Sequence, residues 1–370
     1  MFNFSQLAFP VVQAPMAGGI NNPKFAAAVA NSGGVGSFGF SYSSPQKISE
    51  DLLATKHLTQ GPINANFFVF REVELPDAGV QSNAVSALQK LSLGDECNIC
   101  VPSAPFYPAL EDQLRPIWTH RPQILTFHFG IPPQGCIEHA HALGIAVGIT
   151  ATSLGEAIEI QKAGVDFVVA QGIEAGGHRG IFDQSTQDDS LSTIDLTQMI
   201  TQNCSLPVVA AGAIMTGLDI RNVLLAGAAA AQLGTAFLCC DEAGSTLAHK
   251  DYLLNKQHRG TVLTKAFSGR MARGIRNEFI DKLESCQVLP FPIQNTMTAS
   301  LRQLAVKTNN GEFQSLWAGS AYSKIRKCST TDLMKILMEE YSAAGGGKLI
   351  NHFVSARLFD SSTSKCIEGK

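Results

Sequence analysis

The stretch VDFVVAQGIEAGGHRG, residues 165–180, carries more information about the fold than any other part of the chain. Four of its first five residues are apolar and three of them are valines, which is typical of a buried strand. The strand runs into a loop that holds two adjacent glycines, Gly176 and Gly177, followed by His178. Adjacent glycines let a backbone approach a flat or phosphorylated ligand, and an imidazole exchanges protons near neutral pH. The pattern predicts a ligand-binding loop, although an ordinary glycine turn with a solvated histidine would look the same.

Eight short apolar runs of this kind occur along the chain, and helical patterns fall between them. Strands that alternate with helices, and that are apolar throughout, favour a parallel sheet. Eight such units predict an α/β fold of the (β/α)8 TIM barrel type. The alternative is a doubly wound open sheet, but its G-x-G-x-x-G turn is missing after the first strand, which runs into PMAGGI instead. The predicted strands are Val11–Met16, Gly34–Phe38, Ile63–Val69, Ile124–Phe129, Ile145–Ile149, Phe167–Gln171, Pro207–Ala211 and Ala230–Phe237.

The pattern changes after the eighth predicted strand. Residues 241–320 contain polar helical stretches, a basic segment and the proline-containing sequence LPFPIQN. Because this segment is too long for a barrel loop, we expect a mostly helical insertion that covers the barrel mouth and forms part of the substrate pocket. The expected division is a ligand-binding barrel over 1–240, completed by about 321–345, the insertion over 241–320, and a loose C-terminal tail over 346–370.

Composition and charge exclude several classes of protein. Hydrophobic residues make up 45% of the chain and charged residues 16%, so a large core is expected. The formal net charge is -3 and the basic residues are dispersed, which does not indicate a nucleic-acid partner. The N-terminus lacks the features of a signal peptide, and no apolar run approaches the roughly 20 residues of a membrane helix, so we expect a cytoplasmic protein without membrane contact. Cys97 and Cys100 lack the second pair that a zinc site requires, so no metal is expected.

Amides, glycines and two histidines follow the predicted strands, at the end of a barrel where ligands bind. Clustered carboxylates are missing there, which disfavours a metal or glycosidase site. No lysine ends a strand, which disfavours a Schiff-base aldolase. The set suits a flat, hydrogen-bonding ligand with a phosphate bound by the turns near residues 212 and 234, unless those glycines only permit tight turns. The candidate ligand-binding residues are Pro15, Met16, Ala17, Asn66, Gln171, Gly176, Gly177, Ala211, Gly212, Gln232, Leu233, Gly234 and Thr235.

Segments from Val12 to about Phe279 resemble the nitronate monooxygenases, the FMN-dependent family once called 2-nitropropane dioxygenases. The segment ending in EAGGHRG and the segment containing SGRMAR are specific to this family, whereas QAPM and the AAG and LGT turns occur in other FMN barrels. A weaker similarity, SLWAG, begins at Ser315. The matching segments are QAPMAGG, NANFFVF, TFHFGIP, TSLGEAIEIQKAGVDFVVAQGIEAGGHRG, PVVAAGAI, AAQLGTAF and TKAFSGRMARGIRNEF.

By this resemblance FMN lies across the barrel mouth and is held by the candidate residues. Gln171 and Asn66 are expected to hydrogen-bond it, with a strand-end turn as the alternative role of Asn66. His178 is expected to be the catalytic base that removes the acidic C–H proton of a nitroalkane, or to position a nitronate that has already lost it. His128 and Tyr107 are expected to bind the substrate, although a core histidine and a surface aromatic residue would also fit these positions.

Two parts of the resemblance leave roles open. Arg270 and Arg273 either bring positive charge near the flavin or hold the insertion against the barrel, and the second role is slightly favoured. Phe291, Asn295 and Ala299 stand where relatives can carry tyrosines and a lysine. This difference concerns the preferred substrate rather than the reaction class.

The implied reaction is the oxidative denitrification of an alkyl nitronate, such as propionate 3-nitronate, with O2. It yields a carbonyl compound and nitrite and needs FMN but neither NAD(P)H nor a metal. One alternative is an NAD(P)H-dependent FMN reductase of quinones or enoyl thioesters, and another is a flavin-binding protein without turnover. The expected partners are the nitronate and O2, and the chain is expected to be a monomer or a homodimer.

Overall fold

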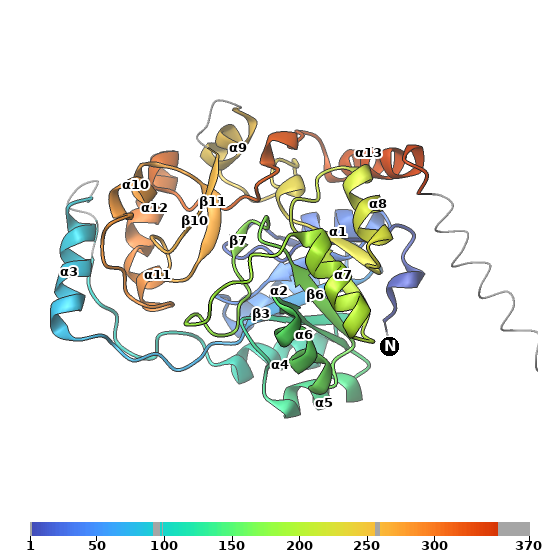
Figure 1. Cartoon of the computed structure of the whole chain (residues 1–370), viewed down its shortest axis with the longest axis horizontal. Coiled ribbons are helices and arrows are strands. Elements are labelled where there is room, and N and C mark those ends of the chain that lie inside the picture. Colours follow the sequence, from blue (N-terminus) through green and yellow to red (C-terminus); the bar gives the residue numbers. More distant parts are fainter. Residues whose placement is uncertain (1, 92–96, 98, 256–259, 347–370) are drawn as a thin grey trace, which may run out of the picture.

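Eight parallel strands form a nearly closed barrel in a computed structural model that describes residues 2–91, 97, 99–255 and 260–346 (Figure 1). Their order is β1-β9-β8-β6-β5-β4-β3-β2, and a parallel bridge between Val12 and Val35 joins the two ends of the series. The predicted (β/α)8 barrel is therefore confirmed, and the open sheet is excluded. The strands are β1 (Val11–Gln13), β2 (Gly36–Gly39), β3 (Ile63–Phe68), β4 (Ile124–His128), β5 (Ala146–Ala151), β6 (Phe167–Gln171), β8 (Val208–Ala211) and β9 (Ala230–Leu233).

Each predicted strand coincides with an observed strand, but the first and the last end early. β1 ends at Gln13 and β9 ends at Leu233, while Thr235–Phe237 form a short 3-10 helix, η2. After β1, Ala14 still donates its N–H to the Leu233 carbonyl oxygen (2.8 Å), and after β9 Phe237 is buried in η2 rather than in a strand. The strand residues are buried on both faces, as the unbroken burial of β5 and β6 shows.

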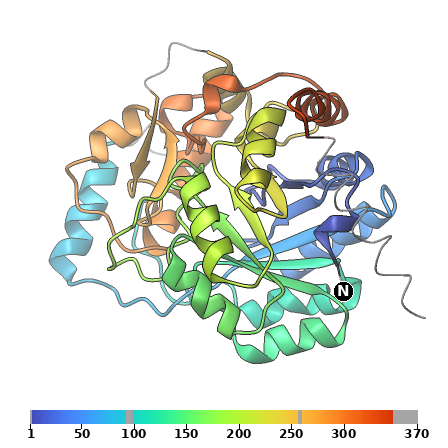
Figure 2. The same cartoon turned by 45° about the vertical axis from the view of Figure 1, so that its right-hand side comes forward.

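Helices surround the barrel (Figures 1 and 2). Several begin at a polar side chain that accepts a hydrogen bond from the first helical turn: Asn22 accepts from the Phe25 N–H (3.1 Å), and Ser153 accepts from the Glu156 N–H (3.2 Å). The barrel helices are α1 (Pro23–Asn31), α2 (Pro45–Lys56), α4 (Leu110–His120), α5 (Gln134–Ala142), α6 (Leu154–Lys162), α7 (Thr193–Asn203), α8 (Gly217–Leu225) and α13 (Thr330–Ala343). None of the helices in the described ranges is long and apolar enough to cross a membrane.

A second group of elements packs beside the barrel with a hydrophobic cluster of its own, which includes Phe267, Phe279 and Leu301. α3 (Ala78–Gln89) joins this group through Ala84 and Leu88 although it follows β3, and Figure 1 shows it next to α10 and α12. The group also contains the short helix η3 (Gly311–Phe313). Its other elements are α9 (Leu247–Leu254), β10 (Thr261–Thr264), β11 (Ala272–Ile275), α10 (Glu278–Leu283), α11 (Ile293–Met297) and α12 (Ala299–Lys307).

A small antiparallel sheet, β10-β11-β7, connects this group to the barrel. β7 consists of Gly177 and His178, in the loop after β6, and pairs with Arg273 and Ala272 of β11. The loop that carries the predicted catalytic residue is thus part of a sheet that the sequence pattern did not indicate. The proposed domain boundaries stay predictions, and the tail predicted over 346–370 lies, apart from Gly346, outside the described residues.

Candidate active site

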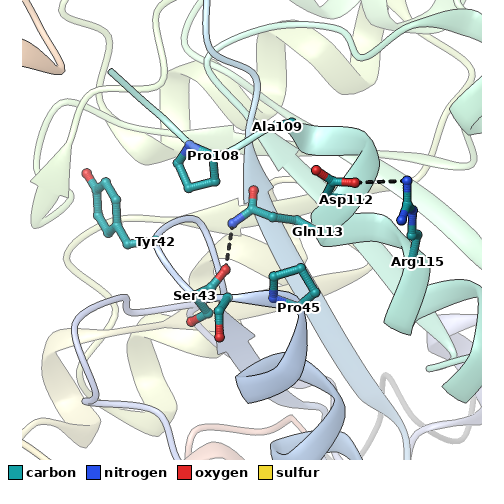
Figure 3. A pocket seen from close by; sticks show the side chains of 9 residues that line it. Tyr42, Ser43, Pro45, Pro108, Ala109, Asp112, Gln113 and Arg115 are labelled. Atoms are coloured by element: carbon teal, nitrogen blue, oxygen red, sulfur yellow. Dashed lines mark hydrogen bonds and ion pairs between the residues drawn. The ribbon is translucent and has the colours of Figure 1, made fainter. Parts of the chain in front are cut away.

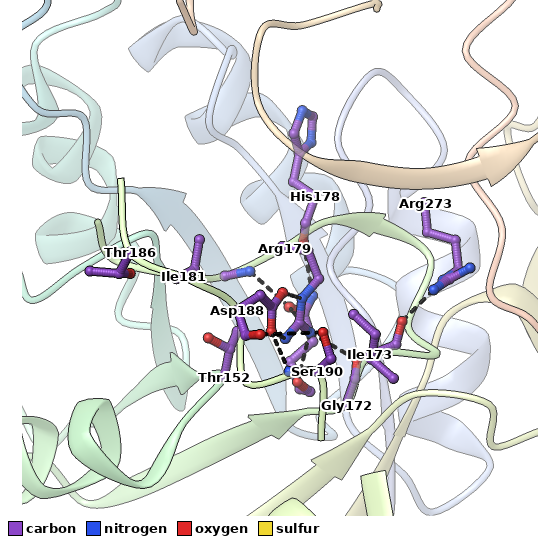
Figure 4. A network of polar contacts seen from close by, with 12 residues as sticks. Thr152, Gly172, Ile173, His178, Arg179, Ile181, Thr186, Asp188, Ser190 and Arg273 are labelled. Atoms are coloured by element: carbon purple, nitrogen blue, oxygen red, sulfur yellow. Dashed lines mark hydrogen bonds and ion pairs between the residues drawn. The ribbon is translucent and has the colours of Figure 1, made fainter. Parts of the chain in front are cut away.

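A buried arginine holds the loop after β6 in place (Figure 4). Arg179 is 1% exposed and binds Asp188 through Nε–Oδ2 (2.7 Å) and Nη2–Oδ1 (2.9 Å). Its Nη1 donates to the carbonyl oxygens of Gln171 and Gly172, both at 2.9 Å. Burial raises the pKa of Asp188, but hydrogen bonds from Arg179 and from the Ser190 N–H outweigh it, so this pKa lies below its usual range. A bidentate ion pair of this kind fixes the orientation of both partners.

The amide side chain of Gln171 fixes the other side of the loop. Its Oε1 accepts a hydrogen bond from the Gly180 N–H (2.8 Å), and its Nε2 donates to the carbonyl oxygen of His178 (2.9 Å). The same carbonyl accepts a hydrogen bond from Nε2 of His128 (3.2 Å). Gln171 and His128 therefore both hold the backbone carbonyl group of His178 in place. Gln171 thus has a structural task, and its role as a ligand to FMN stays a prediction.

The ring of His178 points toward the insertion and lies 2.9 Å, Nε2 to Oγ, from Ser268. Burial, and to a smaller extent the positive charge of Arg270, lower the pKa of His178 to about 3. The ring is therefore neutral at pH 7 and has a lone pair that can accept a proton. This is the protonation state that a general base requires.

His128 is also neutral, and its single ring hydrogen is already used in a hydrogen bond within the protein, so only an acceptor atom is left for a ligand. Burial lowers its pKa to about 3. Since a carbonyl oxygen can only accept, Nε2 must carry the hydrogen in the contact with the His178 carbonyl, which leaves Nδ1 without one. In this form His128 supports the His178 backbone and has no second N–H for a nitro group.

An aromatic group surrounds the two histidines. The ring centroid of Phe68 lies 5.8 Å from that of His128 and 6.2 Å from that of His178, and Phe291 lies 5.6 Å from His178. Phe70 stacks on Tyr107 (4.6 Å) and on Phe291 (5.7 Å), so Tyr107 adjoins the aromatic group, while its role in substrate binding stays a prediction. The sequence analysis did not identify Phe68 or Phe70. Their spacing of two residues at the end of β3 is the signal that places both on one side of the chain.

Positive charge without a carboxylate partner lies in the same region. Arg270 is 5% exposed, and its guanidinium carbon lies 3.7 Å from the ring centroid of Phe129, at the distance of a cation–π contact. Burial lowers its pKa to about 9, so it stays charged at pH 7. Within the described part of the chain, no carboxylate forms an ion pair with Arg270 or with Arg302. The region therefore attracts anions.

Arg270 and Arg273 also connect the insertion to the barrel loop. Arg270 donates from Nη2 to the carbonyl oxygen of Ile181, and Arg273 donates from Nε to that of Ile173 (3.0 Å; Figure 4). The contact of Arg273 is purely structural, whereas Arg270 combines such a contact with a position over Phe129. Both arginines therefore hold the insertion against the barrel, and a role for the charge of Arg270 near the flavin stays a prediction.

The turns after β8 and β9 have the geometry of an anion cradle. Gly212 has φ +133° and Ala213 has φ +53°, so the chain turns sharply, and a Cβ on Gly212 would lie 2.4 Å from Thr193 Oγ1. The backbone N–H groups of Ala213, Thr235 and Ala236 have no acceptor among the described residues. Unpaired amides at the ends of two neighbouring strands, β8 and β9, suit a phosphate.

Gly176 brings a distant segment against one of these turns. A Cβ on Gly176 would lie 2.6 Å from the backbone of Ala318 and Gly319, so only glycine permits this contact. The Gly319 N–H in turn donates to Thr235 Oγ1 (2.9 Å). Gly177 has φ +76° and open space around its Cα, which fits the left-handed conformation that glycine favours.

The predicted residues of β1 and β9 also lie together. A Cβ on Gly234 would lie 3.2 Å from Ala14 Cβ and 4.0 Å from the Met16 sulfur. Asn21, which the sequence analysis did not identify, accepts a hydrogen bond from the Met16 N–H, but its own buried Nδ2 has no partner among the described residues. Pro15, Ala17 and Gln232 are half-buried here, while Ala211 and Leu233 are buried.

Asn66 points into a polar network inside the barrel. Its Nδ2 donates to Thr126 Oγ1 (3.0 Å), and Thr126 donates to Asn64 Oδ1 (3.0 Å). Gln13, at the end of β1, accepts a hydrogen bond from the Ser37 N–H (2.9 Å), whereas its buried Nε2 has no partner within the described ranges. A buried donor without an acceptor costs about 1–3 kcal/mol, so these orphaned amides fit a site completed by a ligand with acceptor atoms.

A cavity of about 540 Å³ opens outside the barrel between the first turns of α2 and α4 (Figure 3). Its lining contains none of the predicted site residues, and Gln113 donates from Nε2 to the Ser43 carbonyl oxygen (3.0 Å) at its floor. It adjoins the aromatic group through Tyr42, whose ring centroid lies 5.6 Å from that of Phe68.

Comparisons with known proteins agree with this architecture. A sequence profile described as nitronate monooxygenase matches residues 1–340. The chain is 36% identical to a nitronate monooxygenase of Pseudomonas aeruginosa over 338 residues (90% of this chain and 95% of that protein). It is 37% identical to one of Paraburkholderia phytofirmans over 340 residues (90% and 92%).

Among solved structures, the nitroalkane oxidase from Streptomyces ansochromogenes superimposes with a TM-score of 0.87 at 33% identity and covers 92% of this chain and 98% of its own. FabK from Thermotoga maritima, at 22% identity and a TM-score of 0.71 (94% and 97% covered), shares the fold. The match of the family profile, together with relatives above 30% identity along most of their length, shows that the chain is an enzyme, an oxidoreductase, and that it belongs to the nitronate monooxygenase family.

Proposed function

We propose that the chain binds FMN at the barrel mouth and oxidises alkyl nitronates with O2 to a carbonyl compound and nitrite. Family membership supports the oxidation of nitronates, while FMN, O2 and propionate 3-nitronate as a substrate are the proposal's own content. The observation that carries it is the neutral His178 ring, held between an aromatic wall and an unpaired guanidinium group at the end of the barrel where ligands bind.

The residues at the strand ends fit FMN. The unpaired amides of Ala213, Thr235 and Ala236 suit its phosphate, and the orphaned amide nitrogens of Gln13 and Asn21 suit its carbonyl and hydroxyl oxygens. Thr193 packs close to Gly212, which leaves the turn no room for a side chain. When bound, FMN would supply the redox group that accepts electrons from the nitronate.

The protein's own contribution begins with charge. A nitronate is an anion, and the guanidinium groups of Arg270 and Arg302 have no described carboxylate to neutralise them. They stabilise a bound anion in a region from which the aromatic group excludes water. A bound anion beside His178 also raises the pKa of the ring from its low value toward the operating pH.

His178 then acts according to the substrate. A neutral nitroalkane must lose its C–H proton, and the neutral imidazole can accept it. A preformed nitronate has already lost this proton, so the ring only positions it. The backbone contacts from Gln171 and His128 keep the ring in the orientation that either role needs.

The test is aerobic turnover of propionate 3-nitronate by the FMN-loaded protein, without NAD(P)H, with nitrite and O2 uptake measured together. Free FMN at the same concentration is the control. We expect continuous nitrite release that depends on the protein, and a change of the flavin's visible spectrum when the nitronate is added without oxygen. Bleaching of the flavin by NADPH, with quinone reduction and no nitrite, would support a reductase instead. Retained FMN with no nitrite from any nitronate would support a flavin-binding protein.

A further inference from the structure

Ser268 makes three contacts through one hydroxyl group. It is 1% exposed and is the first residue of the SGRMAR segment, which runs into β11. Its Oγ is 2.9 Å from His178 Nε2, 3.0 Å from the Arg270 carbonyl oxygen and 3.3 Å from the Arg270 backbone nitrogen. The pairing of β7 with β11 places His178 opposite Ala272 and so keeps the two side chains in register.

The directions of these hydrogen bonds follow from the number of hydrogens. A serine hydroxyl has one hydrogen to donate. The Arg270 carbonyl oxygen can only accept, and no other donor to it is present among the described residues, so the Ser268 hydrogen goes to this carbonyl. The Arg270 N–H donates to Oγ. For His178, Oγ can then only be an acceptor, and Nε2 must carry the hydrogen. The opposite arrangement would leave a buried carbonyl oxygen unpaired, which is unfavourable.

We infer that Ser268 is a positioning residue that holds His178 in the Nε2–H tautomer, so that Nδ1 is the atom that accepts the substrate's proton. No hydrogen bond to Nδ1 of His178 is present among the described residues, and this atom is not completely buried, so it is free to accept a proton. The neutral ring has a lone pair there at pH 7. The SGRMAR segment, which is specific to the family, thereby has a chemical role that does not depend on Arg270 or Arg273.

The inference rests on the proposed function only in its kinetic part. The tautomer of a histidine is a property of the protein and can be measured without substrate. Protein labelled with 15N-histidine, loaded with FMN, gives separate NMR signals for protonated and unprotonated ring nitrogens. The loss of signals in His178→Asn identifies those of His178 among the nine histidines of the chain.

We expect the hydrogen on Nε2 in the native protein and a mixture of tautomers, or the Nδ1–H form, in Ser268→Ala. Turnover of a neutral nitroalkane should fall roughly 10- to 100-fold in Ser268→Ala, which is less than the loss of about 10²–10⁴ for a missing general base because the base is still present, and that of the preformed nitronate should fall by a smaller factor. Ser268→Thr keeps the hydroxyl and should restore both the tautomer and most of the turnover.

A hydrogen on Nδ1 of His178 in the native protein would overturn the inference, and so would an unchanged Nε2–H form in Ser268→Ala. If Ser268→Ala does not fold, the native spectrum alone decides. If the native protein shows the Nε2–H form but oxidises no nitroalkane or nitronate, the proposed function fails while the assignment of the tautomer stands.

Discussion

Replacing Arg179 with methionine should destabilise the protein more than the loss of an exposed ion pair would. The change keeps the length of the side chain but removes the bidentate bond to Asp188 and the donors to the carbonyl oxygens of Gln171 and Gly172. Removing one partner of a buried pair costs about 3–5 kcal/mol, because the other charge stays buried without compensation. Asp188 is 24% exposed and regains some solvation, so we expect a loss of about 3 kcal/mol, the lower end of this range.

Urea unfolding of both proteins measures this loss as a shift of the midpoint with an unchanged slope. The matched control is Arg115→Met, which breaks an ion pair with Asp112 whose side chains are 70% and 53% exposed. Such a pair contributes at most about 1 kcal/mol. A loss below about 1 kcal/mol for Arg179→Met, equal to that of the control, would refute the claim that Arg179 anchors the catalytic loop.

Three further results are expected. Gly212→Val should lower FMN affinity at least 10-fold in equilibrium dialysis, because its φ of +133° and the close Thr193 leave no place for a side chain; unchanged affinity in a folded variant would show that this turn does not bind the phosphate. The free energy of unfolding should fall as the pH drops from 6.5 toward 3, because His128 and His178 bind protons in the unfolded chain but not in the folded one. The expected loss is up to about 2 kcal/mol at pH 5 for each histidine, and equal urea midpoints at pH 7 and 5 would contradict it. Arg270→Gln should raise the KM for nitronates several-fold and that for neutral nitroalkanes by a smaller factor, and an equal change in both would show that its charge does not bind the anion.

The barrel could be predicted because its signal is local. Each strand is a short apolar run such as Phe167–Gln171, and runs of this kind are buried wherever helices cover both faces of a sheet. The small antiparallel sheet could not be predicted, because β7 has two residues and no periodicity of its own. Its partner in β11 follows about 95 residues later, and only the packing of the insertion brings the two together.

The candidate site could likewise be predicted where it depends on local sequence signals, but not where it depends on tertiary contacts. The positions of His178 and the glycine turns follow from the barrel, because strand ends meet at one mouth. The partners of each side chain depend on tertiary contacts. The amide of Gln171 looked free to bind a ligand, yet the loop turns back onto it, and Ser268 lies 90 residues from the histidine it contacts.

The comparison of a neutral nitroalkane with its preformed nitronate in His178→Asn tests the central claim most directly. Asparagine keeps some hydrogen bonding but cannot act as a base near pH 7. Turnover of the nitroalkane should fall by about 10²–10⁴, and turnover of the nitronate far less, because only the first substrate still has a proton to lose. Equal losses for both substrates, with normal FMN content and spectrum, would contradict the assignment of His178 as the base, and no loss for either would transfer the role to His128.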